Sequence, residues 1–166
     1  MKRRILLVDD DLAVLLTLKA VLELQGFEVE TAASSAEAFA RLESRVYQMV
    51  ISDLRMETEE AGLEVIRAAR RQSYDPATAL LTAYPPSGEY WNELPGEQKQ
   101  SAQTGDGKRR DGEDWAGENS ASLLIKPLGT RDLLRQIEAL LVTHADKQKR
   151  LRDSAGKTQQ ADRQAG

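Results

Sequence analysis

The chain has 166 residues, a formal net charge of −4 and no cysteine. This length allows one domain with its own core, and the missing cysteines exclude a thiol nucleophile, a zinc–thiolate site and a disulfide framework. The mixed charges give no long-range attraction to nucleic acid, and no apolar run approaches the roughly 20 residues that span a bilayer. We therefore expect no direct nucleic-acid binding, no membrane insertion and a cytoplasmic protein.

The first half of the chain alternates strand-like and helix-like patterns. Short apolar runs predict strands, and apolar residues three or four positions apart predict helices. Such alternation is typical of parallel βαβ units with helices on both faces of a sheet. The expected elements are a strand at 5–8, a helix at 12–24 ended by Gly26, a strand at 27–31, a helix begun by Ser34 or Ser35, a strand at 47–52, a helix at 62–71 and a strand at 78–82.

The composition changes abruptly over residues 84–121. Apolar residues nearly vanish there, and Gly, Glu, Gln, Ser and Asp dominate. Long loops inside compact domains tend to be functional or disordered, so we expect an insertion to which no helix is assigned. Both tryptophans, Trp91 and Trp115, lie within it. We expect them to anchor short helical pieces on the domain surface rather than to form a partner-binding patch.

Regular structure is expected again after the insertion. Residues 122–126 predict a strand, and residues 131–141 predict a helix. The rest of the chain is polar and lacks apolar residues for a core. We therefore expect one domain at 1–143, a disordered polar tail at 144–166, and no second folded domain.

Four predicted strands end on residues that phosphoryl chemistry can use. Taken alone, each has an ordinary structural explanation, as a helix cap, a strand end or a surface lysine. The carboxyl ends of parallel strands share one edge of a sheet, so the joint occurrence of these residues predicts one site. They are Asp9 and Asp10 after the first strand, Asp53 after the third, Thr82 after the fourth and Lys126 after the last.

Asp53 is the candidate nucleophile. A carboxylate at a strand end can attack phosphorus and form an aspartyl phosphate. Because the phosphoryl group and Asp53 are both anionic, a divalent metal is needed to offset their repulsion. Mg²⁺ prefers oxygen ligands and takes few direct carboxylates, which suits Asp10, Asp53 and the backbone carbonyl of Arg55, with Asp9 acting through water.

Thr82 and Lys126 complete the predicted site. A threonine hydroxyl and a lysine ammonium can each donate a hydrogen bond to a phosphoryl oxygen. Both groups therefore stabilise the charge of the phosphorylated form, and neither needs to act as a base.

Four segments carry a resemblance to a known family: Ile5-Leu6-Leu7-Val8-Asp9-Asp10-Asp11, Ser52-Asp53-Leu54-Arg55-Met56, Leu80-Leu81-Thr82-Ala83 and Ile125-Lys126-Pro127-Leu128. They resemble the receiver domain of bacterial two-component response regulators over roughly residues 3–143. The resemblance implies an α/β, flavodoxin-like, doubly wound sheet of five parallel strands, here with an insertion between strands 4 and 5. It also implies phosphorylation of Asp53 by a sensor histidine kinase or phosphotransfer protein, and sensing of the phosphoryl group by Thr82 and Lys126.

Three features depart from the family pattern. Thr82 and Lys126 are 126 − 82 = 44 positions apart, about twice the usual spacing, which locates the insertion. Leu123 stands where the family commonly has a switching aromatic residue, and Glu57 stands where a proline often follows the methionine. We expect an altered route of signal transmission and an irregular loop after Asp53.

Residues beside the site are expected to tune the lifetime of the aspartyl phosphate. This bond decays by attack of an in-line water, and Arg55, Ala83 and Tyr84 are the candidate tuning positions. We hypothesise that the bulky Tyr84 slows decay by shielding the phosphorus.

Three functional classes compete. The leading one is a stand-alone receiver, which docks on a downstream protein target or passes phosphate along a phosphorelay. The second is a phosphorylation-independent pseudo-receiver that binds partners through residues 84–121. The third is a Mg²⁺-dependent phosphatase, but such enzymes need a second acid two residues after the nucleophile, where this chain has Arg55. We therefore expect no turnover of external substrates.

Overall fold

Five parallel strands form one sheet in the computed structural model, which describes residues 2–82, 122–125 and 129–164, with backbone alone at 122–125 and 155–164. The strand order is β2-β1-β3-β4-β5, and all pairs are parallel. The doubly wound parallel sheet predicted from the sequence is confirmed over β1 to β4. The strands are β1 (Arg4–Val8), β2 (Glu28–Ala32), β3 (Met49–Asp53), β4 (Ala77–Thr82) and β5 (Ser122–Ile125).

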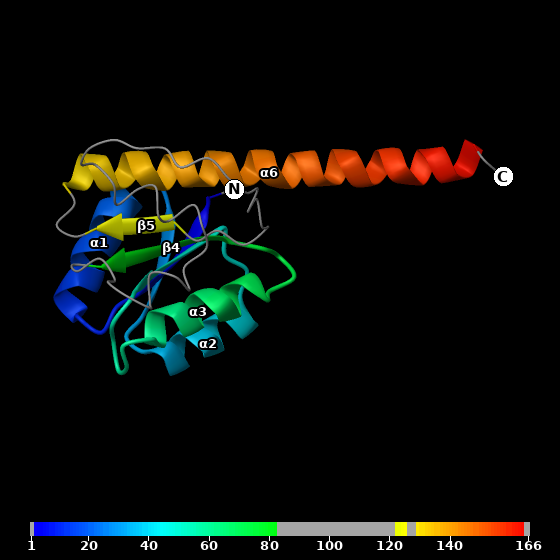
Figure 1. Cartoon of the computed structure of the whole chain (residues 1–166). Coiled ribbons are helices and arrows are strands. Elements are labelled where there is room, and N and C mark those ends of the chain that lie inside the picture. Colours follow the sequence, from blue (N-terminus) through cyan, green and yellow to red (C-terminus); the bar gives the residue numbers. More distant parts are fainter. Residues whose placement is uncertain (1, 83–121, 126–128, 165–166) are drawn as a thin grey trace, which may run out of the picture.

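Helices cover both faces of the sheet (Figure 1). Side chains of successive strand residues point to opposite faces of the sheet. The apolar residues of the central strand β1 therefore pack into two separate cores, one on each face. Ile5 and Leu7 pack with α1 and α6, whereas Leu6 and Val8 pack with α2 and α3. The helices are α1 (Leu12–Leu24), α2 (Ser35–Ser44), α3 (Ala61–Arg70) and α6 (Thr130–Gln164).

The starts of α1 and α2 and the end of α1 lie at residues whose chemistry favours a helix boundary. Asp11 caps α1, because its carboxylate accepts hydrogen bonds from the backbone N–H groups of Ala13 and Val14. Gly26 follows this helix with φ +88°, a conformation that glycine adopts without strain. Ser34 caps α2 and accepts from the N–H of Glu37. The predicted boundaries at Gly26 and Ser34 are therefore confirmed.

The last helix differs from the prediction of a disordered tail from residue 144. It continues to Gln164 and extends well beyond the sheet (Figure 1). Side-chain contacts support its middle turns, since His144 Nε2 lies 2.8 Å from the backbone oxygen of Asp75 and Gln148 donates to the same oxygen at 3.0 Å. The tail is also free of proline and rich in good helix formers. The domain boundary at 143 stays a prediction.

Several predicted features lie outside the described residues. They are the insertion at 84–121 with Trp91 and Trp115, the tuning residues Ala83 and Tyr84, the site residue Lys126, and the side chain of Leu123.

Candidate functional site

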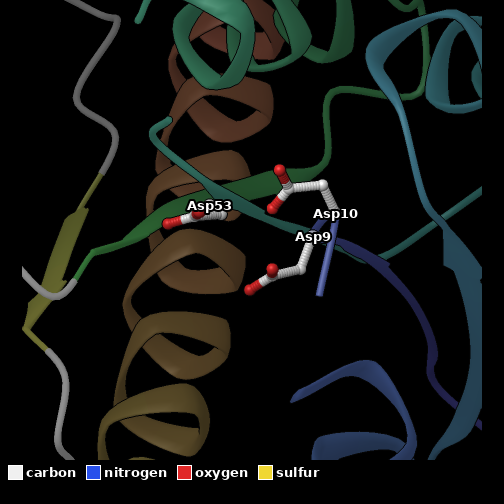
Figure 2. A group of neighbouring side chains, drawn as sticks. All are labelled: Asp9, Asp10 and Asp53. Carbon is white, nitrogen blue, oxygen red and sulfur yellow. The ribbon is translucent and has the colours of Figure 1, made fainter. Parts of the chain in front are cut away.

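Three carboxylates meet at the carboxyl edge of the sheet. Asp9, Asp10 and Asp53 each offer one oxygen, and these oxygens all lie within 4.8 Å of one another (Figure 2). The strand register explains the meeting, because Val8 of β1 pairs with Ser52 of the adjacent β3. The residues that follow this pair are Asp9 and Asp53. The predicted convergence of the three acids is present in the structure.

Asp9 is the most enclosed acid of the three, with 4% of its surface exposed. Its backbone N–H donates to the oxygen of Ala32 at 3.1 Å, and its carboxylate accepts from the N–H of Asp11 at 2.9 Å. Asp11 in turn caps α1 and does not belong to the cluster. The turn after β1 therefore directs two of three consecutive acids to the site and uses the third to start a helix.

Asp53, the last residue of β3, packs against the start of α3. A β-carbon on Gly62 would collide with the backbone of Asp53 and of Leu54, so a side chain at this position would displace one of the two elements. The N–H of Gly62 donates to the oxygen of Leu54 at 3.1 Å. Sequence reasoning identified Gly62 only as a helix start. The available sequence signal was a glycine in the first turn of the helix that follows the candidate nucleophile. Such a glycine can indicate close packing of the helix on the strand end.

The loop at 54–60 connects Asp53 to α3 and contains Arg55, which is exposed. The N–H of Met56 donates to the oxygen of Thr58 at 3.2 Å, which closes a tight turn. This short internal bond gives the loop after Asp53 a defined shape.

Glu57, in the middle of this loop, contacts the start of α2. One of its carboxylate oxygens accepts from the N–H of Ser35 at 2.6 Å and from the Ser35 hydroxyl at 3.0 Å. Burial alone would raise the pKa of Glu57, but hydrogen bonds from its own N–H and from Ser35 outweigh it and lower the pKa. Glu57, which departs from the family pattern, therefore makes a contact with Ser35 that the sequence did not predict.

Thr82 ends β4 at the same edge of the sheet and is 2% exposed. Its predecessor Leu81 pairs with Asp53, so Thr82 extends one residue beyond the candidate nucleophile on the adjacent strand. On its other side Thr82 pairs with Ile125, the residue before Lys126. The backbone thus brings the expected hydroxyl to the expected edge.

The donor set fits a hard divalent cation. All three groups of the cluster are carboxylates, and Mg²⁺ binds oxygen ligands in preference to nitrogen or sulfur. Three like charges this close repel one another, which a cation offsets. The chemistry of the three carboxylates is therefore consistent with Mg²⁺.

A comparison with protein-family models decides the classification of the chain. The model of the response regulator receiver domain matches residues 5–89, about half of the chain. The chain belongs to the response regulator receiver family. The matched part of this receiver contains the three acids of the cluster together with Thr82, and receivers of this family act in two-component systems.

Curated relatives of this receiver are longer regulatory proteins. The acid tolerance regulatory protein ActR of Rhizobium meliloti is 39% identical over 82 residues, which are 49% of this chain and 42% of ActR. The alginate biosynthesis transcriptional regulatory protein AlgB of Pseudomonas aeruginosa is 40% identical over 81 residues, which are 49% of this chain and 18% of AlgB. The match thus spans less than half the length of either relative.

Solved structures show the same fold. A CheY-like receiver domain of Methanospirillum hungatei superposes with a TM-score of 0.67 and 25% identity, covering 89% of this chain and 99% of the other. The response regulator TrrA of Thermotoga maritima, solved in complex with Mg²⁺ and BeF, superposes with a TM-score of 0.59 and 28% identity, covering 83% and 98%. The flavodoxin-like α/β fold is therefore shared with established receivers.

Across the part of the chain that the structure describes, every helix is too short or too polar to cross a lipid bilayer.

Proposed function

We propose that this receiver accepts a phosphoryl group on Asp53 from a sensor histidine kinase or a phosphotransfer protein, and that the modification changes a surface read by a downstream protein. The observation that carries the proposal is the convergence of three carboxylate oxygens within 4.8 Å at the ends of β1 and β3. Family membership supports it, because the cluster lies inside the matched receiver segment.

The proposed cation is Mg²⁺, held by Asp10, Asp53 and the backbone carbonyl of Arg55, with Asp9 acting through water. When bound, Mg²⁺ neutralises the charge that builds up between the phosphoryl oxygens and the carboxylates. The Mg²⁺ and BeF complex of TrrA, a receiver of the same fold, supports the choice of Mg²⁺ as the cation.

Asp53 is the proposed nucleophile. One of its carboxylate oxygens forms a bond to phosphorus while the bond between phosphorus and the donor group breaks. The burial of Asp9 restricts its side chain, and the close packing of Gly62 restricts the backbone of Asp53, which reduces the entropy lost on reaching the reactive geometry.

Thr82 and Lys126 are the proposed sensors of the phosphoryl group. The Thr82 hydroxyl belongs to a nearly inaccessible residue at the end of β4, and a hydrogen bond from it to a phosphoryl oxygen is favoured by this low-dielectric setting. Lys126, directly after β5, supplies the positive charge in this proposal. The tuning roles of Arg55, Ala83 and Tyr84 stay predictions.

The receiver is not expected to turn over external phosphate esters. Arg55 stands two residues after Asp53, so this position offers no acid for protonating a leaving group. That the receiver acts alone stays a prediction, because ActR and AlgB join a matching segment to further sequence.

The test is the intact mass of the chain after incubation with Mg²⁺ and acetyl phosphate. The proposal predicts one phosphate adduct on the parent chain, and its loss in Asp53→Ala and in the presence of a chelator. An unmodified parent chain under all these conditions would reject the proposal and favour a phosphorylation-independent pseudo-receiver.

A further inference from the structure

The contact between Glu57 and Ser35 joins two elements that are distant in the sequence. Glu57 lies in the 54–60 loop after β3, and Ser35 is the first residue of α2. One Glu57 oxygen accepts both the Ser35 N–H at 2.6 Å and the Ser35 hydroxyl at 3.0 Å. Two donors on one residue hold this carboxylate oxygen of the 54–60 loop at the start of α2.

The start of α2 favours this contact. The first N–H groups of a helix have no partner within the helix, and the helix dipole attracts negative charge to this end. Two N–H groups at this helix start already have side-chain acceptors. The Glu37 N–H donates to the Ser34 hydroxyl, and the Ala33 N–H donates to the Glu37 carboxylate. The Ser35 N–H donates instead to the carboxylate of Glu57, which lies in a different part of the chain.

The same loop carries the proposed backbone ligand for Mg²⁺. Arg55 lies two residues before Glu57, and the Met56 N–H donates to the backbone oxygen of Thr58. Residues 55–58 therefore form one compact turn. The partly buried Met56 also packs against the core on the α2 and α3 side. The Glu57 contact and the Arg55 peptide group therefore lie within one short turn, which is anchored both at Ser35 and at the core.

We propose that Glu57 is a positioning residue, whose hydrogen bonds to Ser35 keep the backbone carbonyl of Arg55 in place for Mg²⁺ binding. Glu57 does not touch the cation in this proposal and acts through the loop. The inference rests on the proposed function, because the carbonyl is a ligand only when the site binds Mg²⁺. It adds a determinant of metal affinity that lies outside the acidic cluster.

The experiment is calorimetric titration of Mg²⁺ into the parent chain and three variants. Glu57→Ala removes the acceptor, and Glu57→Gln keeps an acceptor oxygen for Ser35 while removing the charge. Glu59→Ala removes the same charge from an exposed position in the same loop. We expect Glu57→Ala to raise the dissociation constant of Mg²⁺ about tenfold, the lower end of the effect of outer-shell partners, with Glu57→Gln and Glu59→Ala near the parent value.

Hydrogen exchange of the metal-free protein gives a second readout. Loss of the acceptor in Glu57→Ala is expected to speed exchange at the Ser35 amide and in the 54–60 loop, whereas Glu57→Gln is expected to restore protection. Unchanged thermal midpoints would show that α2 stays folded in each variant.

The outcomes separate the two proposals. If the parent chain binds Mg²⁺ and takes phosphate while Glu57→Ala binds Mg²⁺ equally well, the positioning role is wrong and the proposed function stands. Equal weakening in Glu57→Ala, Glu57→Gln and Glu59→Ala would show an effect of charge and would also overturn the positioning role. A parent chain that neither binds Mg²⁺ nor takes phosphate overturns both.

Discussion

A β-carbon on Gly62 would overlap the backbone carbonyl oxygen of Asp53. Glycine thus allows the first turn of α3 to pack directly on the end of β3, where the candidate phosphoacceptor lies. The neighbouring hydrogen bond from the Gly62 N–H to Leu54 closes the loop that joins the two elements. The position of Asp53 therefore depends on a residue nine places later in the sequence that has no side chain.

Gly62→Ala is predicted to destabilise the fold by about 3 kcal/mol, the upper part of the usual range for overpacking, because the colliding atoms are backbone. Gly26→Ala is the matched control. Gly26 has open space around it but a φ of +88°, so its substitution costs only the left-handed conformation, about 1 kcal/mol. Urea unfolding measures both values, and equal losses would show that the close packing at Gly62 does not matter.

Asp10→Asn is predicted to weaken Mg²⁺ binding by about tenfold or more, since even outer-shell partners of a metal are worth about 10- to 100-fold. Asp11→Asn removes the same charge one residue later. Asparagine is also a good helix cap, and Asp11 caps α1 rather than joining the acidic cluster, so its variant is expected to bind nearly as well as the parent. Calorimetry that finds the two variants equally weakened would place Asp10 outside the metal site.

The sequence predicted the parts of this receiver that depend on local pattern and strand order. Apolar runs identified β1, β3 and β4, and apolar residues alternating with glutamates identified β2. The residues at the ends of β1 and β3 identified the edge where Asp9, Asp10 and Asp53 meet. This worked because parallel strands must end at one edge, so residues after successive strands become neighbours without further information.

Contacts between loops could not be predicted in this way. Glu57 was recognised as a departure from the family pattern, but its partner Ser35 lies 22 residues away at the start of another helix. Likewise, the continuation of α6 past His144 was missed, because the tail lacks an apolar stripe and its contact to Asp75 comes from a loop before β4. Such pairs depend on how loops are placed in three dimensions.

Tyr47 is predicted to make stability depend on pH in the alkaline range. Burial, together with its hydrogen bond to Glu30 at 2.8 Å, raises the pKa of this tyrosine above its ordinary value of 10.0. The folded state then holds a proton that the unfolded state releases, so the stabilisation is complete below about pH 10 and is lost as the pH rises beyond it. In Tyr47→Phe this loss is expected to be smaller.

Denaturant unfolding measures the effect between about pH 8 and about pH 11. This range lies on both sides of the ordinary tyrosine pKa of about 10. At neutral pH, Tyr47→Phe is expected to cost about 1.5–3 kcal/mol, because the lost hydrogen bond has a charged acceptor. Curves for parent and variant that run parallel through the alkaline range would refute the assignment.

Gln148→Ala is predicted to loosen α6 beyond the sheet. Gln148 donates to the backbone oxygen of Asp75, and its loss is expected to cost about 1 kcal/mol of local stability. Hydrogen exchange of the α6 amides after His144 measures this change. Lys149→Ala, at the next and exposed position, is the control and is expected to leave exchange unchanged. Similar exchange in both variants would mean that the Asp75 contact does not hold the helix.

Residue-level trapping of the phosphoryl group tests the central claim most directly. Borohydride reduces an aspartyl phosphate to homoserine, and trypsin then releases residues 46–55, in which Asp53 is the sole acid. After treatment with Mg²⁺ and acetyl phosphate, we predict homoserine in this peptide. Homoserine found instead in residues 5–19, which contain Asp9, Asp10 and Asp11, would contradict the assignment of Asp53 as the phosphoacceptor.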